Sequence, residues 1–386
     1  MEPVDYAVIG GGVVGLTIAR ELARRHPRAR IAVLEKEAHL GEHASGRNSG
    51  VLHAGFYYAP DSLKARLTAR GNQLLRAFCA EHEVPVRSCG KVVVASSADQ
   101  LPALDELVRR GTANGVRLEI VDERGLADLE PLAQTVDRAI WSPDTGVADP
   151  KAVTAALQAD LLARGVQILT STPVTGPDLP VAHIVNAAGL YADRVAAWFG
   201  FCDDYVMMPF KGLYWYGNDR APRLQRHVYP VPDPRNPFLG VHFTVTPDGG
   251  VKVGPTAIPV LSREAYSWAF RGDEAREVAT SFPAFLRGGH HDVPALIRAE
   301  VPKYSRRYLV RQARALVPTA DGFTVRGRPG IRAQLMHKAS GRLEMDFVVR
   351  GDERSTHVLN AVSPAWTASL AFAELVVDGM AERGAA

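Results

Sequence analysis

Three glycines near the start of the chain have the spacing of a turn that binds a dinucleotide. The apolar run 5–9 is followed directly by the pattern G-x-G-x-x-G, with Gly10, Gly12 and Gly15 as its glycines. In such a turn the first glycine allows a tight bend, the second lets the backbone approach a pyrophosphate, and the third lets helix and strand pack closely. A helix that begins here presents free N–H groups and a partial positive charge to phosphates. We expect Val14, inside the pattern, to contact the same ligand.

An acidic residue completes this pattern. Glu35 follows a second strand-forming run, 30–34, and lies 20 residues beyond Gly15. A carboxylate at about this distance is expected to hold the ribose hydroxyls of an adenosine. Strand, glycines, helix, strand and acid therefore occur in the order that a bound dinucleotide requires, and Lys36 is expected to contact the same ligand. A glycine-rich turn without a ligand would leave Glu35 unexplained.

Two later segments repeat the order of strand, turn and helix, with small residues at the turn. The apolar run that begins at 184 ends in Ala188 and Gly189. The run that begins at 358 ends in Ser363 and Pro364, which are typical of a helix N-cap and of the first helical residue. In a parallel sheet such turns meet at the carboxyl ends of the strands, where ligands bind. A helix N-terminus there stabilises a reduced, anionic flavin. Each turn alone is also typical of ordinary α/β connections, but together they favour FAD.

The elements that must position these turns are of two kinds. The turns belong to alternating strands and helices, as in an α/β fold with a parallel sheet. Short strands separated by Pro, Gly and Asp over 205–252 predict an antiparallel sheet instead. We therefore expect a discontinuous, Rossmann-like FAD-binding domain and an inserted, mainly antiparallel substrate-binding domain. The expected FAD-binding domain consists of residues 1–85, 146–204 and 325–386, and the substrate-binding domain consists of 86–145 and 205–324.

Composition excludes several other classes of protein. A chain of 386 residues favours two domains. The net charge is +3, with acids and bases interspersed, so we expect no nucleic-acid partner. Cys79, Cys89 and Cys202 show neither metal-ligand spacing nor an even count, and we expect no metal site or disulfide framework. No apolar run reaches the ~18–20 residues of a membrane-spanning helix. A strand expected four residues after Met1 leaves no room for a signal peptide. We expect a cytoplasmic protein, with peripheral contact with the inner membrane left open.

A loop after Glu35 carries a resemblance to a known family. The segment Ser45-Gly46-Arg47-Asn48-Ser49-Gly50-Val51-Leu52-His53-Ala54-Gly55 resembles the signature of the L-2-hydroxyglutarate dehydrogenases/oxidases, in the D-amino-acid oxidase-like FAD superfamily. The resemblance continues over nearly the whole chain, for example in 209–212, 229–234, 237–244, 330–334 and 359–365. The chain departs from the family with Lys211 in place of arginine, Val362 in place of proline, and Trp366 in place of a small residue. The resemblance implies FAD contacts from Ser45, Asn48, Ser49, Gly50 and Val51.

Two histidines are candidates for proton transfer. Oxidation of a secondary alcohol sends a hydride to the flavin N5 and leaves a hydroxyl proton, which a neutral imidazole accepts near pH 7. His53 is the first candidate, because its small neighbours allow a flavin ring to approach closely. The second candidate is His242, as a base or as a donor to a carboxylate. Either ring could instead be satisfied by backbone groups, and His53 could simply contact the flavin or be covalently joined to it.

Cationic side chains are candidates for substrate binding. The resemblance implies a substrate with two carboxylates, which need paired cations or several donors. Arg332 is the first candidate, because a guanidinium binds a carboxylate through two parallel hydrogen bonds, and Lys211 is the second. Arg47 and Lys64 are equally consistent with solvated side chains or with contacts to the flavin phosphates. Additional donors are Tyr216, Tyr229 and Tyr266.

These features together predict an FAD-dependent enzyme. By resemblance, it oxidises a small 2-hydroxy acid, (S)-2-hydroxyglutarate, to 2-oxoglutarate, with quinone or oxygen as the electron acceptor. One alternative is an amino acid or amine oxidase of the same fold, in a biosynthetic pathway. Another, from a different class, is a flavin-binding subunit or sensor without turnover. The response of the yellow protein to 2-hydroxyglutarate without oxygen separates the three.

Overall fold

A six-stranded sheet carries the N-terminal glycine turn. The computed structural model describes residues 4–384 apart from 234–235, 268–270 and 291. The strand order of the sheet is β19-β20-β10-β1-β2-β9, parallel except at β19. Strands β1, β2 and β20 are almost entirely buried, as expected for strands covered on both faces, and β2 is a continuous apolar run. The strands are β1 (Val4–Ile9), β2 (Ile31–Leu34), β9 (Gln167–Leu169), β10 (Val181–Asn186), β19 (Val348–Gly351) and β20 (Ser355–Asn360).

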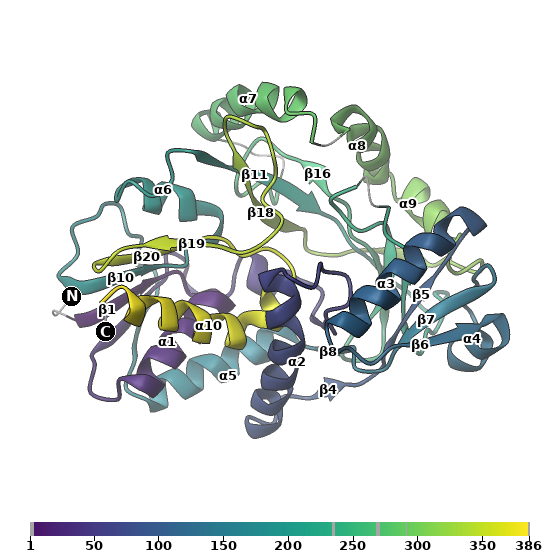
Figure 1. Ribbon diagram of the computed structural model, residues 1–386, viewed down its shortest axis with the longest axis horizontal. Coiled ribbons are helices and arrows are strands. Elements are labelled where there is room, and N and C mark those ends of the chain that lie inside the picture. The colour runs from purple at the N-terminus through teal and green to yellow at the C-terminus, as the bar shows by residue number, and fades with distance from the viewer. Residues whose placement is uncertain (1–3, 234–235, 268–270, 291, 385–386) are drawn as a thin grey trace.

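Helices cover both faces of this sheet (Figure 1). On one face α1 packs against α10 and α5, and α10 packs against α2. The other face carries the short helix α6. α10 begins at Ala365, so Pro364 is its N-cap and not, as predicted, its first residue. The helices are α1 (Val13–Arg25), α2 (Leu63–Glu81), α5 (Pro150–Ala163), η3 (Gly189–Tyr191), α6 (Ala192–Ala197) and α10 (Ala365–Glu382).

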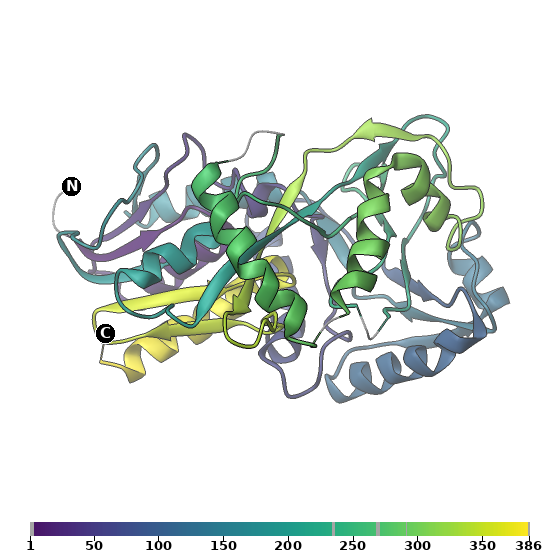
Figure 2. The ribbon, with the colours of Figure 1, turned by 90° about the horizontal axis from the view of Figure 1, so that it is seen from above.

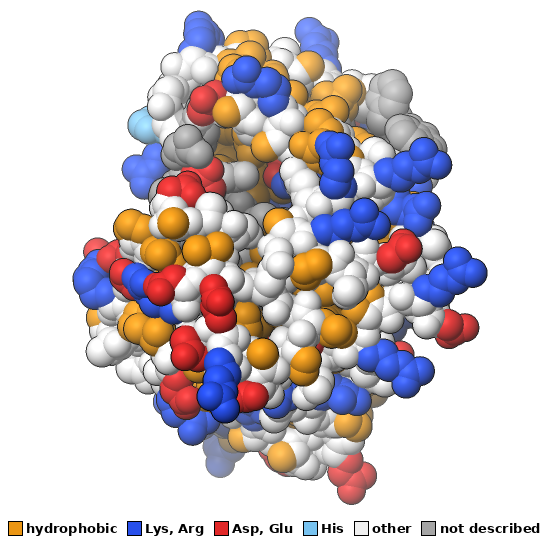
Figure 3. Space-filling view, turned by 90° about the vertical axis from the view of Figure 1, so that its right-hand side faces the viewer, with side chains coloured by type: hydrophobic (Ala, Val, Ile, Leu, Met, Phe, Trp, Pro, Cys, Tyr) orange, Lys and Arg blue, Asp and Glu red, His pale blue; other side chains and the backbone are white. Residues whose placement is uncertain are grey.

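An eight-stranded sheet forms the other half of the molecule. Its order is β17-β12-β15-β14-β13-β5-β7-β6, with only the β13–β5 pair parallel among these neighbours. The strands are β5 (Lys91–Val94), β6 (Glu119–Asp122), β7 (Arg138–Ser142), β12 (Trp215–Gly217), β13 (His227–Pro230), β14 (His242–Val245), β15 (Val251–Gly254) and β17 (Phe323–Arg326). The accompanying helices are η2 (Ala98–Gln100), α3 (Leu101–Ala113), α4 (Glu123–Leu129), η4 (Val301–Tyr304) and α9 (Arg306–Ala313). On the outer face of this half, acidic and basic side chains are interspersed with apolar ones (Figure 3).

Two small sheets connect these halves. Strands β11 (Tyr205–Gly212) and β18 (Gly330–His337) form a long antiparallel ladder, with β16 (Ile258–Pro259) at its edge. Figure 2 shows this ladder crossing from one half to the other. The second small sheet joins β3 (Val51–Leu52), β4 (Val86–Arg87) and β8 (Gly146–Ala148). The remaining elements are η1 (Ala44–Gly46), α7 (Gly272–Arg287) and α8 (Val293–Glu300).

The described helices do not include a membrane span. Among the described residues, none of the helices combines the length and the apolar character that a membrane crossing requires. The mixed α/β architecture agrees with the predicted fold class. The exact division of the chain into two domains stays a prediction.

Candidate active site

A cavity of about 1000 Å³ lies between the carboxyl ends of the parallel strands and the eight-stranded sheet. Segments far apart in the sequence line it, as the three separate turns predict. Of the residues predicted to hold FAD, Gly15 and Gly50 do not line the cavity. The others do: Gly10, Gly12, Val14, Glu35, Lys36, Ser45, Asn48, Ser49, Val51, Ala188, Gly189, Ser363 and Pro364.

The glycine turn explains why side chains are missing at this end of the cavity. Gly10 has φ +111°, and a Cβ there would lie 2.5 Å from the carbonyl oxygen of Ala187. A Cβ at Gly15 would lie 2.0 Å from the carbonyl oxygen of Gly10, so helix and strand pack without a side chain between them. Gly12 is different, because a Cβ there would meet only Ser45 Oγ, at 3.0 Å. The Val13 N–H donates to Ser45 Oγ at 2.8 Å, and Gly12 keeps the rest of the N-terminus of α1 clear of a side chain, which suits a phosphate.

Glu35 is held at the base of this end by backbone groups. Its side chain is buried, and its Oε2 accepts a hydrogen bond of 2.7 Å from the Gly11 N–H. Its Oε1 accepts one of 2.9 Å from the Glu37 N–H. Each carboxylate oxygen has a second lone pair for a hydroxyl donor. Glu35, the open helix N-terminus and the glycine cradle thus fit the adenosine and pyrophosphate of FAD.

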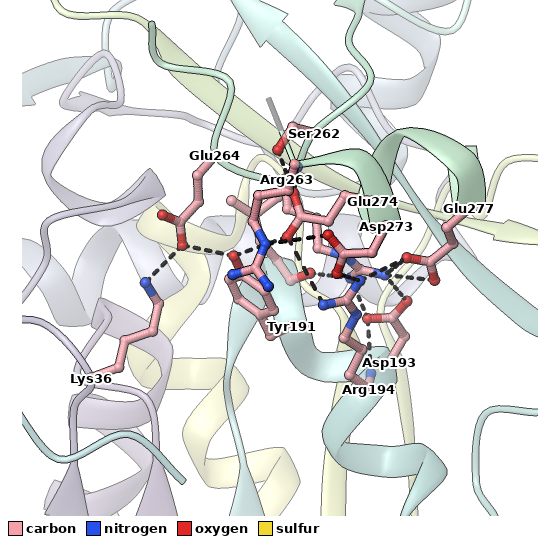
Figure 4. A network of polar contacts seen from close by, with 12 residues as sticks. Lys36, Tyr191, Asp193, Arg194, Ser262, Arg263, Glu264, Asp273, Glu274 and Glu277 are labelled. Atoms are coloured by element: carbon pink, nitrogen blue, oxygen red, sulfur yellow. Dashed lines mark hydrogen bonds and ion pairs between the residues drawn. The ribbon is translucent and has the colours of Figure 1, made fainter. Parts of the chain in front are cut away.

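Lys36, beside Glu35, takes part in an ion-pair network. Its Nζ lies 2.7 Å from Glu264 Oε1 and also bonds to Glu37. Ligand atoms of Glu37, His43 and Glu264 lie within 4.8 Å of one another, a spacing open to a metal. The Lys36 ammonium, however, already bonds to both carboxylates, and the cluster is explained as an ion-pair network. Figure 4 shows Glu264 between Lys36 and Tyr191, whose hydroxyl donates to Glu264 Oε1 at 2.9 Å.

Further along this network a buried arginine joins the segment after β16 to two helices. Arg263 is 1% exposed and forms two hydrogen bonds to the Asp193 carboxylate, the second from Nη2 to Oδ2 at 2.8 Å. It also bonds to Glu277 at 2.9 Å and to the carbonyl oxygen of Leu190. The segment after β16 is therefore fixed to α6 and α7, as Figure 4 shows.

Two imidazoles lie in the wall of the cavity at its other end. His53 follows β3 and its backbone N–H donates to Thr367 Oγ1, at 3.1 Å. No hydrogen bond joins its ring to another described residue. Burial, reinforced by the charge of Lys91, lowers the pKa of His53 well below 6.5. The ring is therefore neutral at pH 7 and can accept a proton.

His242 is held more firmly. Its Nδ1 lies 2.9 Å from the carbonyl oxygen of Gly240, which can only accept, so Nδ1 carries the hydrogen and Nε2 is free to accept. Its ring stacks on Tyr229, with centroids 3.9 Å apart. Burial lowers the pKa of His242 to about 3. A neutral ring with a free Nε2 can accept a proton, but it cannot donate to a carboxylate from that nitrogen.

A guanidinium faces the same end of the cavity. Arg332, on β18, lines the cavity with its guanidinium 5.0 Å from the ring centroid of Phe238. It forms no ion pair with another described residue, and burial lowers its pKa. Tyr214, which the sequence analysis did not select, also lines the cavity and interacts electrostatically with Arg332. Trp366 lines the cavity too, and its buried indole N–H has no partner among the described residues. The guanidinium can donate to a ligand in the cavity.

Some of the predicted substrate residues lie elsewhere. Lys211 and Tyr266 line a second, smaller hollow of about 310 Å³, and neither lines the large cavity. Lys211 stands between Phe210 and Gly212, which do line it, so strand alternation directs Lys211 to the opposite face. Tyr266 bonds to His43 Nδ1 at 2.8 Å and lies beneath the Arg47 guanidinium. Tyr229 and Arg47 line the large cavity. Tyr216, which is 37% exposed, and Lys64, which is buried, do not line it.

Comparison with known proteins agrees with this geometry. The family model "FAD dependent oxidoreductase" (DAO) matches residues 5–379. The mitochondrial L-2-hydroxyglutarate dehydrogenase of Nematostella vectensis is 38% identical over 99% of this chain and 91% of its own length. The L-2-hydroxyglutarate dehydrogenase of Indibacter alkaliphilus is 34% identical over 97% of this chain and 98% of its own.

The similarity extends to solved structures, where it concerns the fold. The FAD-bound L-alpha-glycerophosphate oxidase of Mycoplasma pneumoniae superposes with a TM-score of 0.78 at 23% identity, over 99% of this chain and 95% of the other. Glycine oxidase from Geobacillus kaustophilus gives 0.71 at 20% identity, over 98% and 95%. The predicted α/β fold, FAD cofactor and family resemblance are confirmed. The chain belongs to the DAO family of FAD-dependent oxidoreductases.

Proposed function

We propose that this protein oxidises (S)-2-hydroxyglutarate, also called L-2-hydroxyglutarate, to 2-oxoglutarate. The observation that carries the proposal is that His53 and Arg332 line the same cavity as the residues that fit FAD. The names of the relatives at 38% and 34% identity support this substrate. The amino acid oxidase alternative rests on solved structures such as glycine oxidase at 20% identity, which support the fold alone.

Each residue has a defined part in this proposal. When bound, FAD supplies an acceptor for the hydride from C2 of the substrate. His53 accepts the hydroxyl proton on a ring nitrogen, because burial keeps that ring neutral. Arg332 binds a substrate carboxylate through two N–H groups. The aromatic walls formed by Tyr229, Phe238 and Trp366 restrict water around the reacting atoms.

The electron acceptor and the location of the protein belong to the same proposal. Regeneration of the oxidised enzyme requires a second substrate, for which we propose quinone or oxygen. Mixing the reduced holoenzyme with each acceptor and following the return of the yellow colour distinguishes them. The cytoplasmic location, with or without contact with the inner membrane, stays a prediction.

An anaerobic spectrum tests the proposed reaction. Adding L-2-hydroxyglutarate without oxygen should bleach the yellow holoenzyme and produce 2-oxoglutarate. Bleaching by amino acids alone would show an amino acid oxidase. A yellow protein that none of these compounds bleaches would show a flavin-binding protein without turnover.

We expect Arg332→Lys to weaken substrate binding while the protein stays yellow. Lysine keeps the charge but loses the planar pair of N–H donors. Loss of one charge-assisted hydrogen bond, worth about 1.5–3 kcal/mol, corresponds to a roughly 10- to 150-fold rise in the Kd. Titration of the holoenzyme with 2-oxoglutarate, followed by the flavin spectrum, measures this Kd. The matched control is Arg326→Lys, an exposed position outside the cavity. Equal affinity in the two variants would remove Arg332 from the carboxylate site.

We expect Gly12→Val to give a folded but colourless protein. Gly12 has φ −80° and ψ 169°, which valine adopts without strain, and its Cβ would meet only the Ser45 side chain. The valine methyl groups would occupy the space where a phosphate approaches α1. Losing two charge-assisted hydrogen bonds of about 1.5–3 kcal/mol each predicts roughly 100-fold or weaker FAD binding. Circular dichroism checks the fold, and FAD titration measures the affinity. Gly176→Val, where a Cβ meets nothing within 4 Å, is the control and should stay yellow.

A further inference from the structure

One buried charge lies behind the two cavity histidines without an acidic partner. Lys91 begins β5, between β13 and β7, and is 0% exposed. Among the described residues its Nζ has no hydrogen-bond partner and no ion-pair partner. A buried ammonium without a partner is destabilising, because it has lost its hydration and gained no hydrogen bond. The stability of the sheet therefore does not explain why a lysine occupies position 91.

Aromatic rings surround this ammonium. Its Nζ lies 4.6 Å from the ring centroid of Phe56, 4.6 Å from that of Tyr57 and 4.8 Å from that of Tyr229. The negative faces of such rings attract a cation. The cage thus favours the protonated lysine without offering it a hydrogen-bond acceptor.

One side of the cage is also part of the cavity wall. Tyr229 lines the cavity and stacks on His242 with centroids 3.9 Å apart, whereas Lys91 does not line the cavity. The lysine therefore lies behind the wall and acts on the cavity through space. In a site with little water such a charge is weakly screened.

Both cavity histidines experience this charge. The positive charge of Lys91 adds to burial in lowering the pKa of His53 and of His242. Burial lowers the pKa of Lys91 itself to about 7, so Lys91 is protonated over the acidic range in which an imidazole ordinarily takes up its proton. Other titratable groups lie near the two cavity histidines or near the rings around Lys91. They are His227, Lys252, Lys303, Cys89, Tyr57, Tyr58, Tyr214 and Tyr229.

We propose that Lys91 is a positioning residue, whose buried charge holds His53 and His242 as neutral imidazoles and is itself offset by the carboxylates of the bound substrate. The first part concerns the protein alone. The second part rests on the proposed function, because it requires an anionic substrate. Lys91 then serves the reaction twice, by keeping the base unprotonated and by attracting a dianion.

Lys91→Met in the holoenzyme tests the first part. Methionine matches the lysine side chain as far as Cε and lacks only the charged terminal atom. Replacing an unpaired buried charge by an apolar group is expected to leave stability unchanged or higher. With ¹⁵N-labelled histidine, NMR titration should show the ring midpoints of His53 and His242 about one pH unit higher in the variant. Lys91→Gln, also uncharged, is the second variant and should show the same shift. Lys338→Met, at a position remote from the cavity, should leave both rings unchanged.

Two further readouts separate this inference from the proposed function. The acidic limb of the pH profile for anaerobic bleaching should move upward by the same amount in Lys91→Met. The Kd should rise at least about fivefold more for 2-oxoglutarate, a dianion, than for the monoanion 2-oxobutyrate. Equal midpoints of His53 and His242 in wild type and in Lys91→Met would overturn the role of Lys91. The same conclusion would follow if neither ring took up a proton before acid unfolding in either protein. A wild-type holoenzyme that L-2-hydroxyglutarate does not bleach would refute the proposed function alone, since the ring titration needs no substrate.

Discussion

His53→Ala should leave a yellow, folded protein that L-2-hydroxyglutarate bleaches at least about a hundredfold more slowly than wild type. General-base catalysis contributes about 10²–10⁴ in rate. His53 lines the cavity, its ring is hydrogen-bonded to no other described residue, and its pKa is lowered well below 6.5. Stopped-flow measurement of the flavin absorbance without oxygen gives the rate. Unchanged FAD content, read from the spectrum, shows that the loss lies in the chemistry.

The pH dependence of bleaching follows from the same lowered pKa. Only the neutral ring accepts a proton, and the lowered pKa keeps that form dominant below pH 6.5. The rate should therefore stay level as the pH falls from 7 to 6 and decline only in more acidic solution. An enzyme with an ordinary histidine base would lose most of its rate over that interval, because an unperturbed imidazole has a pKa near 6.5.

His242 is the competing base, and a second variant distinguishes the two. The Nδ1–H of His242 donates to Gly240, which leaves Nε2 able to accept a proton as well. We expect His242→Ala to slow bleaching less than His53→Ala, because His242 is already held to the wall by this bond and by its stack on Tyr229. The exposed His39 supplies the control, His39→Ala, which should behave as wild type. If His242→Ala shows the larger loss, the proton acceptor is His242.

Local patterns in the sequence account for the half of the fold that contains the glycine turn. The residues from β1 to Glu35 form a continuous unit whose strand, turn and helix each have a local signal. Turns at the ends of parallel strands meet at one edge, so the segments near Gly10, Ala188 and Ser363 could be expected to converge. The structure does bring them to one cavity. The confirmed family resemblance reaches the same conclusion independently.

Residues whose role depends on long-range packing could not be predicted in this way. The direction of Lys211 depends on the register of β11 against β18, which pairs Lys211 with Ile331 and which no local pattern specifies. The sequence does not predict the burial of Lys91, because a lysine is ordinarily exposed. Its burial arises from β13 on one side of β5 and β7 on the other, both distant in sequence. Tyr214 enters the cavity wall where the chain leaves β11, and the sequence gives no periodic signal there.

Arg263→Met should lower the stability of the whole protein more than any other single arginine change proposed above. Arg263 is 1% exposed and binds the Asp193 carboxylate, which is 6% exposed, through two hydrogen bonds. Removing one partner of a buried ion pair leaves an uncompensated charge and costs about 3–5 kcal/mol. The expected result is a clear fall in the urea midpoint of unfolding, measured on the holoenzyme by circular dichroism and by loss of the flavin signal.

Two comparisons identify the buried charge as the cause. Arg109→Met removes an exposed arginine that pairs with Glu106 at 2.7 Å, and a surface pair of this kind contributes about 0–1 kcal/mol. The double change Arg263→Met with Asp193→Asn should recover part of the loss, because a neutral amide needs no cation and its oxygen can still accept from the Met207 N–H, as Asp193 Oδ2 does at 3.1 Å. A single Arg263→Met variant as stable as Arg109→Met would mean that packing alone fixes the segment after β16 against α6. Recovery in the double variant would instead show that the ion pair, rather than the shape of Arg263, fixes the segment after β16 against α6.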